Sequence, residues 1–211
     1  MTQFPSPLPT AGNGARRLMA MLWAVLAANL VAPLAAAATL EAAPTTLDSV
    51  TFVGRDDHGT AAKLSDWRGK TVLLTMAYSS CREVCSFTLH RLEELQRSAD
   101  RAGIAIEVVV ISYDPKTDSP TSWADYRQHH GLAHTNWHFL TGSSADTEKF
   151  AHALHFRYWR YDEHIVHDFK VLLIEPDERI ATTLTWATRN DDPFTKAAVR
   201  CVATDSLGCK P

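Results

Sequence analysis

The sequence has little net charge, no internal repeat and no low-complexity segment beyond its amino-terminal region. Its 211 residues carry a formal net charge of −3. A protein that binds nucleic acid is expected to carry a basic patch or stripe, and the sequence shows none. Hydrophobic residues make up 45% of the chain and charged residues 21%, which suits one ordinary globular domain with additional segments. We therefore expect no nucleic-acid partner.

The first 38 residues have the pattern of a secretory signal peptide. Arg16-Arg17 supply a basic start, and residues 18–34 are almost wholly apolar. Ala36-Ala37-Ala38 then provide the small residues of a cleavage site. We predict export and cleavage after Ala38.

A retained membrane anchor is the alternative to cleavage, because residues 18–38 can nearly cross a bilayer. Asn29 and Pro33 interrupt the apolar run and favour cleavage. In either case the domain that follows lies in the periplasm or another compartment outside the cytoplasm. We divide the rest of the chain into a linker at residues 39–47, a folded domain at residues 48–200 and a tail at residues 201–211.

Only four cysteines are present, all after the signal segment. Cys81 and Cys85 lie where an apolar run, residues 72–78, gives way to a helical pattern. Side chains four positions apart share one face of a helix, and the N-terminus of a helix favours thiolates through its unpaired N–H groups and its dipole. We expect this pair either to cycle as a disulfide or to hold a soft metal ion. A purely structural disulfide is the alternative, since the spacing permits one.

Cys201 and Cys209 form a second pair near the carboxyl end. We expect a surface disulfide that ties the tail to a short last helix. A second metal or redox site is the alternative, but no histidine lies near these cysteines in sequence.

Strand and helix patterns alternate through the domain. We predict strands at residues 50–53, 61–64, 71–77, 104–112, 137–140, 169–174 and 179–184, and helices at residues 86–102, 121–130, 145–155 and 195–202. The first two strands pair as an N-terminal β-hairpin, and the last two form another hairpin. A strand, a helix and a second strand imply a parallel crossover. The prediction is an α/β fold, a thioredoxin-like mixed sheet flanked by helices, although a thioredoxin motif has two residues between its cysteines and this chain has three.

Several short stretches occur in an order typical of one known family. They are Arg68-Gly69-Lys70, Tyr78 to Cys85, Ile111 to Pro115 with Asp118-Ser119-Pro120, Leu140-Thr141-Gly142, and His167-Asp168. Together they resemble the Sco/SenC family of copper chaperones over residues 48–200. The resemblance implies a thioredoxin-like fold with copper bound by Cys81, Cys85 and His167.

The resemblance also implies partners and a target. Family members deliver copper to, or reduce the thiols of, the binuclear copper site in subunit II of cytochrome c oxidase. That subunit and other periplasmic copper or thiol-redox proteins are the expected partners. The family usually has proline after each cysteine and glycine in the final hairpin, where Arg82, Ser86 and Glu178 stand here. None of these changes removes a ligand, but those at Arg82 and Ser86 alter the charge and stiffness of the metal loop.

Two thiolates and one imidazole form a soft ligand set, suited to Cu(I) and still able to hold Cu(II). A closed structural zinc site would need a fourth ligand, which the sequence does not suggest. Met19, Met21 and Met76 do not form a methionine-rich copper motif.

Of the ten histidines, the resemblance selects His167. Thioredoxins place a proline beside the active cysteines before the corresponding strand, whereas residues 161–170 contain none, which leaves room for a side chain to approach the thiolates. His164 is the second candidate ligand. Asp168 is expected either to orient the imidazole or to cap the strand. Asp114 and Asp118 are expected to be structural, ending a strand and preparing a helix.

The sequence therefore predicts an exported copper-binding metallochaperone for a respiratory cytochrome c oxidase, without enzymatic turnover. An enzyme is the alternative: a periplasmic thiol–disulfide oxidoreductase with Cys81 and Cys85 as its redox pair. His167 discriminates between the two, because only a copper carrier requires it.

Overall fold

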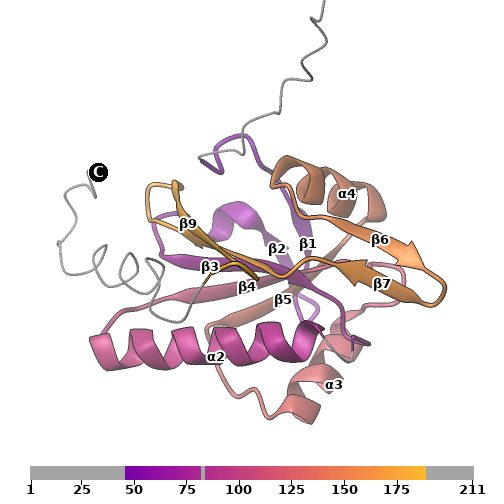
Figure 1. The fold of residues 1–211 in the computed structure, drawn as a ribbon, viewed down its shortest axis with the longest axis horizontal. Coiled ribbons are helices and arrows are strands. Elements are labelled where there is room, and N and C mark those ends of the chain that lie inside the picture. The colour runs from indigo at the N-terminus through magenta and orange to yellow at the C-terminus, as the bar shows by residue number, and fades with distance from the viewer. Residues whose placement is uncertain (1–45, 82–83, 189–211) are drawn as a thin grey trace, which may run out of the picture. The chain divides into compact units, whose positions relative to one another are not determined.

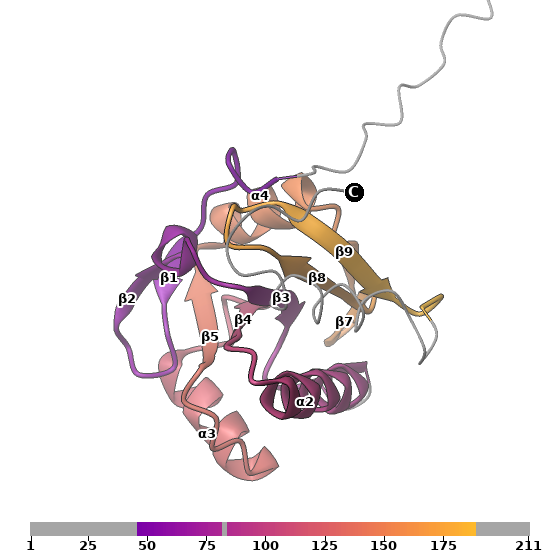
Figure 2. The ribbon, with the colours of Figure 1, turned by 90° about the vertical axis from the view of Figure 1, so that its left-hand side faces the viewer.

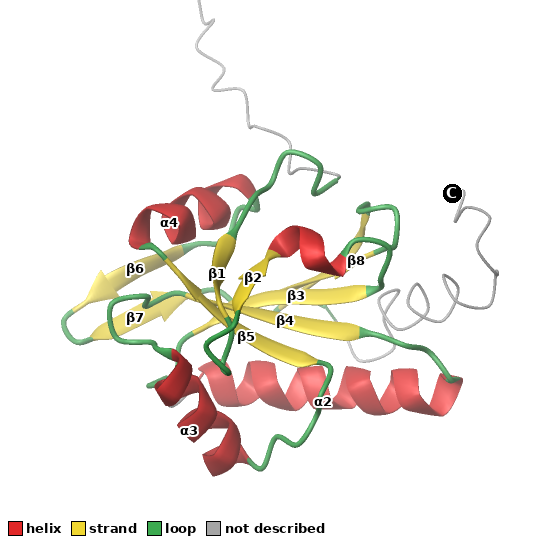
Figure 3. Ribbon diagram, turned by 180° about the vertical axis from the view of Figure 1, so that it is seen from behind, coloured by secondary structure: helices red, strands yellow, loops and turns green. Residues whose placement is uncertain are grey.

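A seven-stranded mixed sheet forms the centre of the fold, with the strand order β2-β1-β5-β4-β3-β8-β9. The computed structural model describes residues 46–81 and 84–188. Figures 1 and 3 show α2 and α3 along one face of the sheet and α4 on the other. The strands of this sheet are β1 Val53–Arg55, β2 Ala61–Lys63, β3 Val72–Ala77, β4 Glu107–Ser112, β5 Trp137–Gly142, β8 Lys170–Ile174 and β9 Ile180–Thr185. The helices are η1 Leu64–Trp67, α2 Val84–Ala102, α3 Pro120–His130 and α4 Ser144–Ala153. The thioredoxin-like α/β fold predicted from the sequence is confirmed.

The central strands β3 and β4 run parallel, in the register Val72↔Glu107 to Ala77↔Ser112. Every residue of β3 is buried, which explains its unbroken apolar sequence: strands covered on both faces read as continuous hydrophobic runs rather than alternating ones. The helix α2 joins β3 to β4, as the predicted crossover requires. Both strands end at the same edge of the sheet, so Tyr78 and Tyr113, which follow them directly, emerge side by side.

The helix α3 begins one residue before the predicted range 121–130 and ends with it. Ser119 is the N-cap, and its hydroxyl accepts a hydrogen bond from the backbone N–H of Ser122. Pro120 occupies the first turn, where its missing N–H costs no helical hydrogen bond. Gly131 ends the helix with φ of 65°, a left-handed conformation that favours glycine.

The predicted N-terminal hairpin is confirmed as β1 and β2, and it lies at one edge of the sheet (Figure 2). It joins the rest through β1, whose Gly54 pairs with Gly142 of β5. The two backbones are close there: a methyl group on Gly54 would lie 2.5 Å from the backbone carbonyl oxygen of Thr141. The 3-10 helix η1 follows β2 directly.

A second, two-stranded sheet was not predicted from the sequence. It consists of β6 Tyr158–Tyr161 and β7 His164–His167, paired antiparallel in the register Tyr158↔His167 to Tyr161↔His164. Burial alternates along β7, with Ile165 and His167 facing the protein. Its strands are four residues long and rich in histidine and aromatic residues, so the apolar alternation typical of a strand is weak. His167 therefore lies on a strand that the sequence did not predict.

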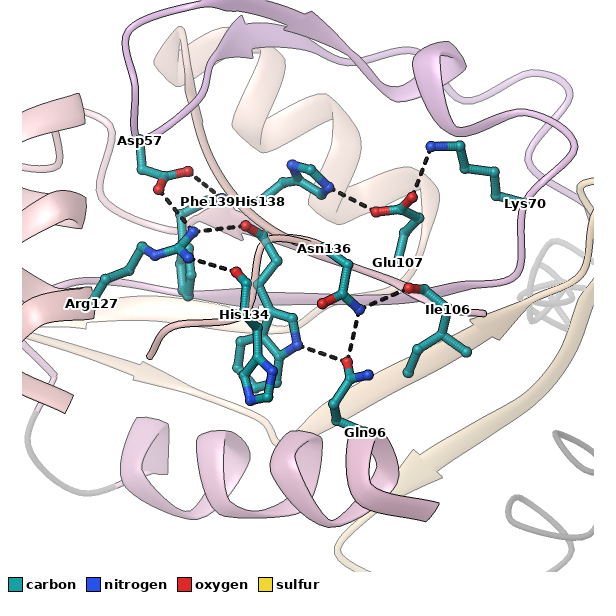
Figure 4. A network of polar contacts seen from close by, with 11 residues as sticks. Asp57, Lys70, Gln96, Ile106, Glu107, Arg127, His134, Asn136, His138 and Phe139 are labelled. Atoms are coloured by element: carbon teal, nitrogen blue, oxygen red, sulfur yellow. Dashed lines mark hydrogen bonds and ion pairs between the residues drawn. The ribbon is translucent and has the colours of Figure 1, made fainter. Parts of the chain in front are cut away.

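A network of buried polar contacts fixes the connection between α3 and β5 (Figure 4). The guanidinium of Arg127 lies 3.0 Å from the carboxylate of Asp57. It also donates hydrogen bonds to the backbone carbonyls of Trp137 and His134, at 2.8 and 2.6 Å. Because the side chain of Asp57 is only 3% exposed, its charge depends on this arginine for compensation.

Glu107 anchors a second part of the same region. Its carboxylate accepts a hydrogen bond from Lys70 at 2.8 Å and pairs with His138 at 2.9 Å. Burial raises the pKa of Glu107, but the hydrogen bonds from Lys70 and His138 oppose this and leave the pKa below its ordinary value. His138 is thus a structural residue of β5.

Among the described residues, no helix has the length and apolar character needed to cross a membrane. The proposed signal segment, the helix predicted at residues 195–202 and the pair Cys201 and Cys209 lie outside the described residues.

Candidate metal centre

The candidate site lies where β3 leads into α2. The chain leaves β3 at Ala77 and turns at Cys81, whose backbone N–H donates to the carbonyl of Tyr78 at 3.1 Å. Cys81 is half-buried and packs against the hydrophobic core. Cys85 is the second residue of α2. One cysteine therefore precedes the helix and the other lies in its first turn, because α2 begins at Val84 and not at residue 86 as predicted.

The second half of the site is His167, the last residue of β7. Its Nε2 lies 3.9 Å from Sγ of Cys81, although 86 residues separate the two in sequence. Its Nδ1 lies 2.8 Å from the backbone carbonyl of Asp168. A carbonyl oxygen only accepts, so Nδ1 carries the proton of this hydrogen bond. In the neutral imidazole, Nε2 then presents its lone pair toward the cysteine.

Two tyrosine rings contact the imidazole of His167. The ring of Tyr113 lies 4.8 Å from the ring of His167, and the ring of Tyr78 contacts it edge-on at 5.8 Å. The hydroxyl of Tyr78 also donates to the carbonyl of Ile165 at 3.2 Å, which attaches β7 to the end of β3. His167 is only 7% exposed, so its position is set by packing as well as by its hydrogen bond.

The structure separates His167 from the other candidate ligand. His164 is exposed, whereas His167 is buried three residues later. Burial alternates along a strand because successive side chains point to opposite faces. His164 and His167 therefore lie on opposite faces of β7, and only His167 faces Cys81.

Asp168 orients the imidazole through its backbone and not through its side chain. Its carbonyl accepts the hydrogen bond from Nδ1 of His167. Its carboxylate instead lies 3.7 Å from the guanidinium of Arg157, a side chain that is 83% exposed. Asp168 therefore contacts the imidazole as expected, but through its backbone carbonyl.

Asp114 and Asp118 follow β4 and are both buried, at 6% and 4% exposure. Asp114 forms an ion pair with Arg160 of β6, which ties the β6–β7 hairpin to the end of β4. Asp118 accepts hydrogen bonds from the backbone N–H and the hydroxyl of Ser79, at 3.0 and 2.6 Å. The sequence placed both residues at the strand end and the helix start. It did not reveal that Asp114 binds the β6–β7 hairpin and that Asp118 binds the turn before Cys81.

An aromatic cluster lies close to both halves of the site in sequence. Phe87 of α2 stacks on Trp186 with 4.8 Å between ring centroids and meets Phe169 edge-on at 4.9 Å. Phe87 comes two residues after Cys85, and Phe169 two residues after His167. These contacts join the first turns of α2 to the beginning of β8.

The structure brings together two atoms that can bind a metal ion, Sγ of Cys81 and Nε2 of His167. Two ligands of one metal ion, bonded at about 2.3 Å through sulfur and about 2.0 Å through nitrogen, lie about 3.5–3.7 Å apart at angles of about 110–120°. The 3.9 Å between Sγ of Cys81 and Nε2 of His167 is close to this value. Among the side chains that the structure describes, which exclude that of Cys85, no group of three His, Cys, Asp or Glu could hold a metal ion. The pair itself has the spacing of two ligands on one ion.

Comparisons with known proteins agree on one family. Residues 42–203 match the family model described as SCO1/SenC. A SCO2-like protein of Rickettsia felis is 27% identical over 99 residues, which make up 45% of this chain. The match spans 47% of that relative, about half of its length.

Solved structures with 20–21% identity show the same fold. ScoI of Arabidopsis thaliana with copper bound has a TM-score of 0.63, with 72% of this chain and 96% of that chain covered. A SCO1/SenC family lipoprotein of Bacillus anthracis has a TM-score of 0.64, with 72% and 90% covered. BsSco, described as a cytochrome c oxidase assembly protein with a disulfide switch, has a TM-score of 0.60, with 71% and 91% covered.

Proposed function

Because the chain belongs to the SCO1/SenC family, we propose that it is a copper carrier that binds the metal through Cys81, Cys85 and His167. The family is linked to copper binding and to cytochrome c oxidase assembly. We further propose that this protein delivers copper to the copper site of a respiratory cytochrome c oxidase or reduces the thiols of that site.

One observation carries the ligand assignment: Nε2 of His167 faces Sγ of Cys81 at 3.9 Å, with Nδ1 engaged elsewhere. A hydrogen bond at Nδ1 fixes the tautomer and ring orientation that a metal ligand requires at Nε2. Cys85 supplies the second thiolate from the first turn of α2. Thiolates at that end of a helix are favoured by the dipole, and they bind soft ions such as Cu(I).

A three-coordinate site suits a carrier. Three ligands leave one side of a copper ion open, and a ligand of the receiving protein can bind there before the metal leaves. The imidazole adds affinity for Cu(II), since nitrogen ligands suit that ion, while the two thiolates retain Cu(I).

The direct test is metal analysis of protein purified reduced and without oxygen. Reduced protein should bind one copper ion per chain. Protein oxidised to the Cys81–Cys85 disulfide should bind none, because metal binding requires thiolates. Equal binding by oxidised and reduced protein would contradict a site made of two thiolates.

A thiol–disulfide oxidoreductase is the second candidate, and the same thiol–imidazole pair favours it. A histidine beside a cysteine promotes the thiolate that attacks a disulfide. In that case Cys81 and Cys85 would exchange disulfides rapidly with a dithiol substrate. Fast exchange together with no copper binding would favour the oxidoreductase over the carrier.

We also propose that the protein acts outside the cytoplasm. The pattern of residues 1–38 supports export, with cleavage after Ala38 or retention of residues 18–38 as an anchor. The linker at residues 39–47 would then connect the domain at residues 48–200 to the membrane in the retained form.

A further inference from the structure

We propose that Asp118 is a positioning residue: it holds the turn that carries Cys81, so that Sγ of Cys81 faces Nε2 of His167. The inference rests on the proposed function, because it concerns the geometry of the same metal centre. Asp118 is not itself a ligand in this account. Its effect on the metal acts through Ser79, two residues before Cys81.

Asp118 joins three elements through its carboxylate. Its Oδ1 accepts hydrogen bonds from the backbone N–H of Ser79 at 3.0 Å and from the hydroxyl of Ser79 at 2.6 Å. Its Oδ2 accepts one from the hydroxyl of Ser112, the last residue of β4, at 2.5 Å. The turn after β3 is thus tied to the end of β4 and to the start of α3.

The direction of these bonds is fixed by the donors around them. The backbone N–H of Asp114 donates to the hydroxyl oxygen of Ser112 at 2.9 Å, so the proton of that hydroxyl is directed to Asp118. The backbone N–H of Ser79 can only donate. Ionised Asp118 accepts all of these bonds, and a neutral apolar side chain would accept none.

The anchor itself is rigid. The backbone N–H of Asp118 donates to the carbonyl of Asp114 at 2.8 Å, and the next residue, Ser119, caps α3. Asp118 is only 4% exposed. Burial raises the pKa of Asp118, while the hydrogen bonds from Ser112 and Ser79 oppose that rise. A buried carboxylate held in this way can fix a loop more firmly than an exposed one, whose bonds compete with water.

The site needs such an anchor because its two halves are mounted separately. His167 is held by the tyrosines and by the carbonyl of Asp168. Cys81 lies on a turn between a strand and a helix, where the backbone follows no regular ladder. Groups that orient metal ligands commonly contribute 10–100-fold to metal affinity, so a change of about 10-fold or more is expected if Asp118 is lost.

The experiment compares Asp118→Ala, Asp118→Asn and Asp57→Asn with the wild-type protein. Asp57 is the matched control: it is also buried and hydrogen-bonded, but it pairs with Arg127 and not with the cysteine turn. Each folded variant is titrated with copper, and the thiolate-to-Cu(II) charge-transfer band is recorded. The reduction potential of the Cys81–Cys85 pair is measured separately.

Asp118→Ala should bind copper about 10-fold more weakly or worse and should shift the charge-transfer band. Asp118→Asn should recover most of the affinity, because its amide oxygen can accept from Ser79 while its amide N–H₂ donates to Ser112. Asp57→Asn should unfold more easily and bind copper like the wild type. Wild-type affinity and an unshifted band in folded Asp118→Ala would overturn the proposal.

Two further readouts keep the proposal testable. If Asp118→Ala does not fold, Ser79→Ala replaces it, since it removes the 2.6 Å bond and leaves the backbone bond to Asp118. Ser79→Ala should still weaken copper binding severalfold, and unchanged binding would count against Asp118. If the wild-type protein binds no copper, the proposed function fails. In that case the reduction potential of the Cys81–Cys85 pair tests the positioning role of Asp118. The same potential in Asp118→Ala and the wild type would contradict that role.

Discussion

At the scale of single residues, the imidazole of His167 donates its hydrogen bond to the backbone of Asp168 and not to the charged side chain of that residue. The acceptor at Nδ1 is the backbone carbonyl of Asp168, while the carboxylate of Asp168 faces the exposed Arg157. A backbone acceptor is present whatever the side chain is. The orientation of His167 is therefore independent of the charge at position 168.

Asp168→Ala should accordingly leave copper affinity within about twofold of the wild type, since exposed ion pairs contribute little. Titration with copper under reducing conditions measures this. A loss of about 10-fold would show that the carboxylate, and not the carbonyl, supports the imidazole.

At the scale of elements, the connection between α3 and β5 depends on one arginine. Arg127 pairs with the buried Asp57 and donates to backbone carbonyls of that connection (Figure 4). Removing one partner of a buried ion pair leaves an uncompensated charge.

Arg127→Ala should therefore lower the free energy of unfolding by about 3–5 kcal/mol, as measured by denaturant titration. The matched control is Arg97→Ala, which removes an exposed pair with Glu93 on α2 and should cost about 0.5 kcal/mol or less. A similar loss in the two variants would contradict the assigned role of the buried pair.

The strands β4 and β5 are linked by a contact that depends on pH. The pKa of Glu107 is held below its ordinary value by Lys70 and His138, despite the opposing effect of burial. A carboxylate with a lowered folded-state pKa stabilises the fold above its unfolded-state pKa, and this contribution disappears as the pH falls through the folded-state value.

Glu107→Gln should thus destabilise the protein at pH 7 and have a smaller effect below the ordinary pKa of 4.5. Denaturant titrations at pH 7 and at acidic pH give the comparison. An effect that is equal at all pH values would mean that the ionised carboxylate contributes nothing specific.

At the scale of the whole molecule, the sequence predicted the main sheet, the N-terminal hairpin and, to within one residue, the range of α3. These features depend on local signals: the unbroken apolar run of β3, the cap at Ser119 and the left-handed glycine at position 131. The β6–β7 hairpin was not predicted because its strands are only four residues long and their sequences do not alternate between apolar and polar residues. Burial alternates along β7 in the folded protein, and this depends on packing that the local sequence does not reveal.

The site was predictable in part for the same reason. The cysteine pair is local, so its spacing and place before a helix were visible in the sequence. The contact between His167 and Cys81 spans 86 residues, and no local pattern predicts it. The family resemblance suggested it, and the absence of proline from residues 161–170 was the one independent indication. The bonds of Asp118 to Ser79 and Ser112 link separate elements, and no local pattern announces them.

The N-terminal region gives a prediction for the whole chain. If the signal is cleaved after Ala38, the mass of the exported protein should correspond to a chain that begins at Thr39. Intact-mass measurement of the exported fraction tests this. A protein of the full 211 residues in the membrane fraction would instead identify residues 18–38 as an anchor.

The central claim is that His167 completes a copper site with Cys81 and Cys85. The matched pair of variants is His167→Ala and His164→Ala, because the two histidines lie on one strand but on opposite faces. Neither the fold nor the Cys81–Cys85 disulfide needs the imidazole, so both variants should fold and oxidise normally.

The most direct measurement is a Cu(II) titration of these two variants beside the wild type. The account predicts that His167→Ala binds Cu(II) about 10-fold more weakly or worse while Cu(I) binding declines less, since the thiolates remain. His164→Ala should bind both ions like the wild type. Wild-type Cu(II) affinity in His167→Ala would contradict the account, and a loss confined to His164→Ala would move the ligand to the other face of β7.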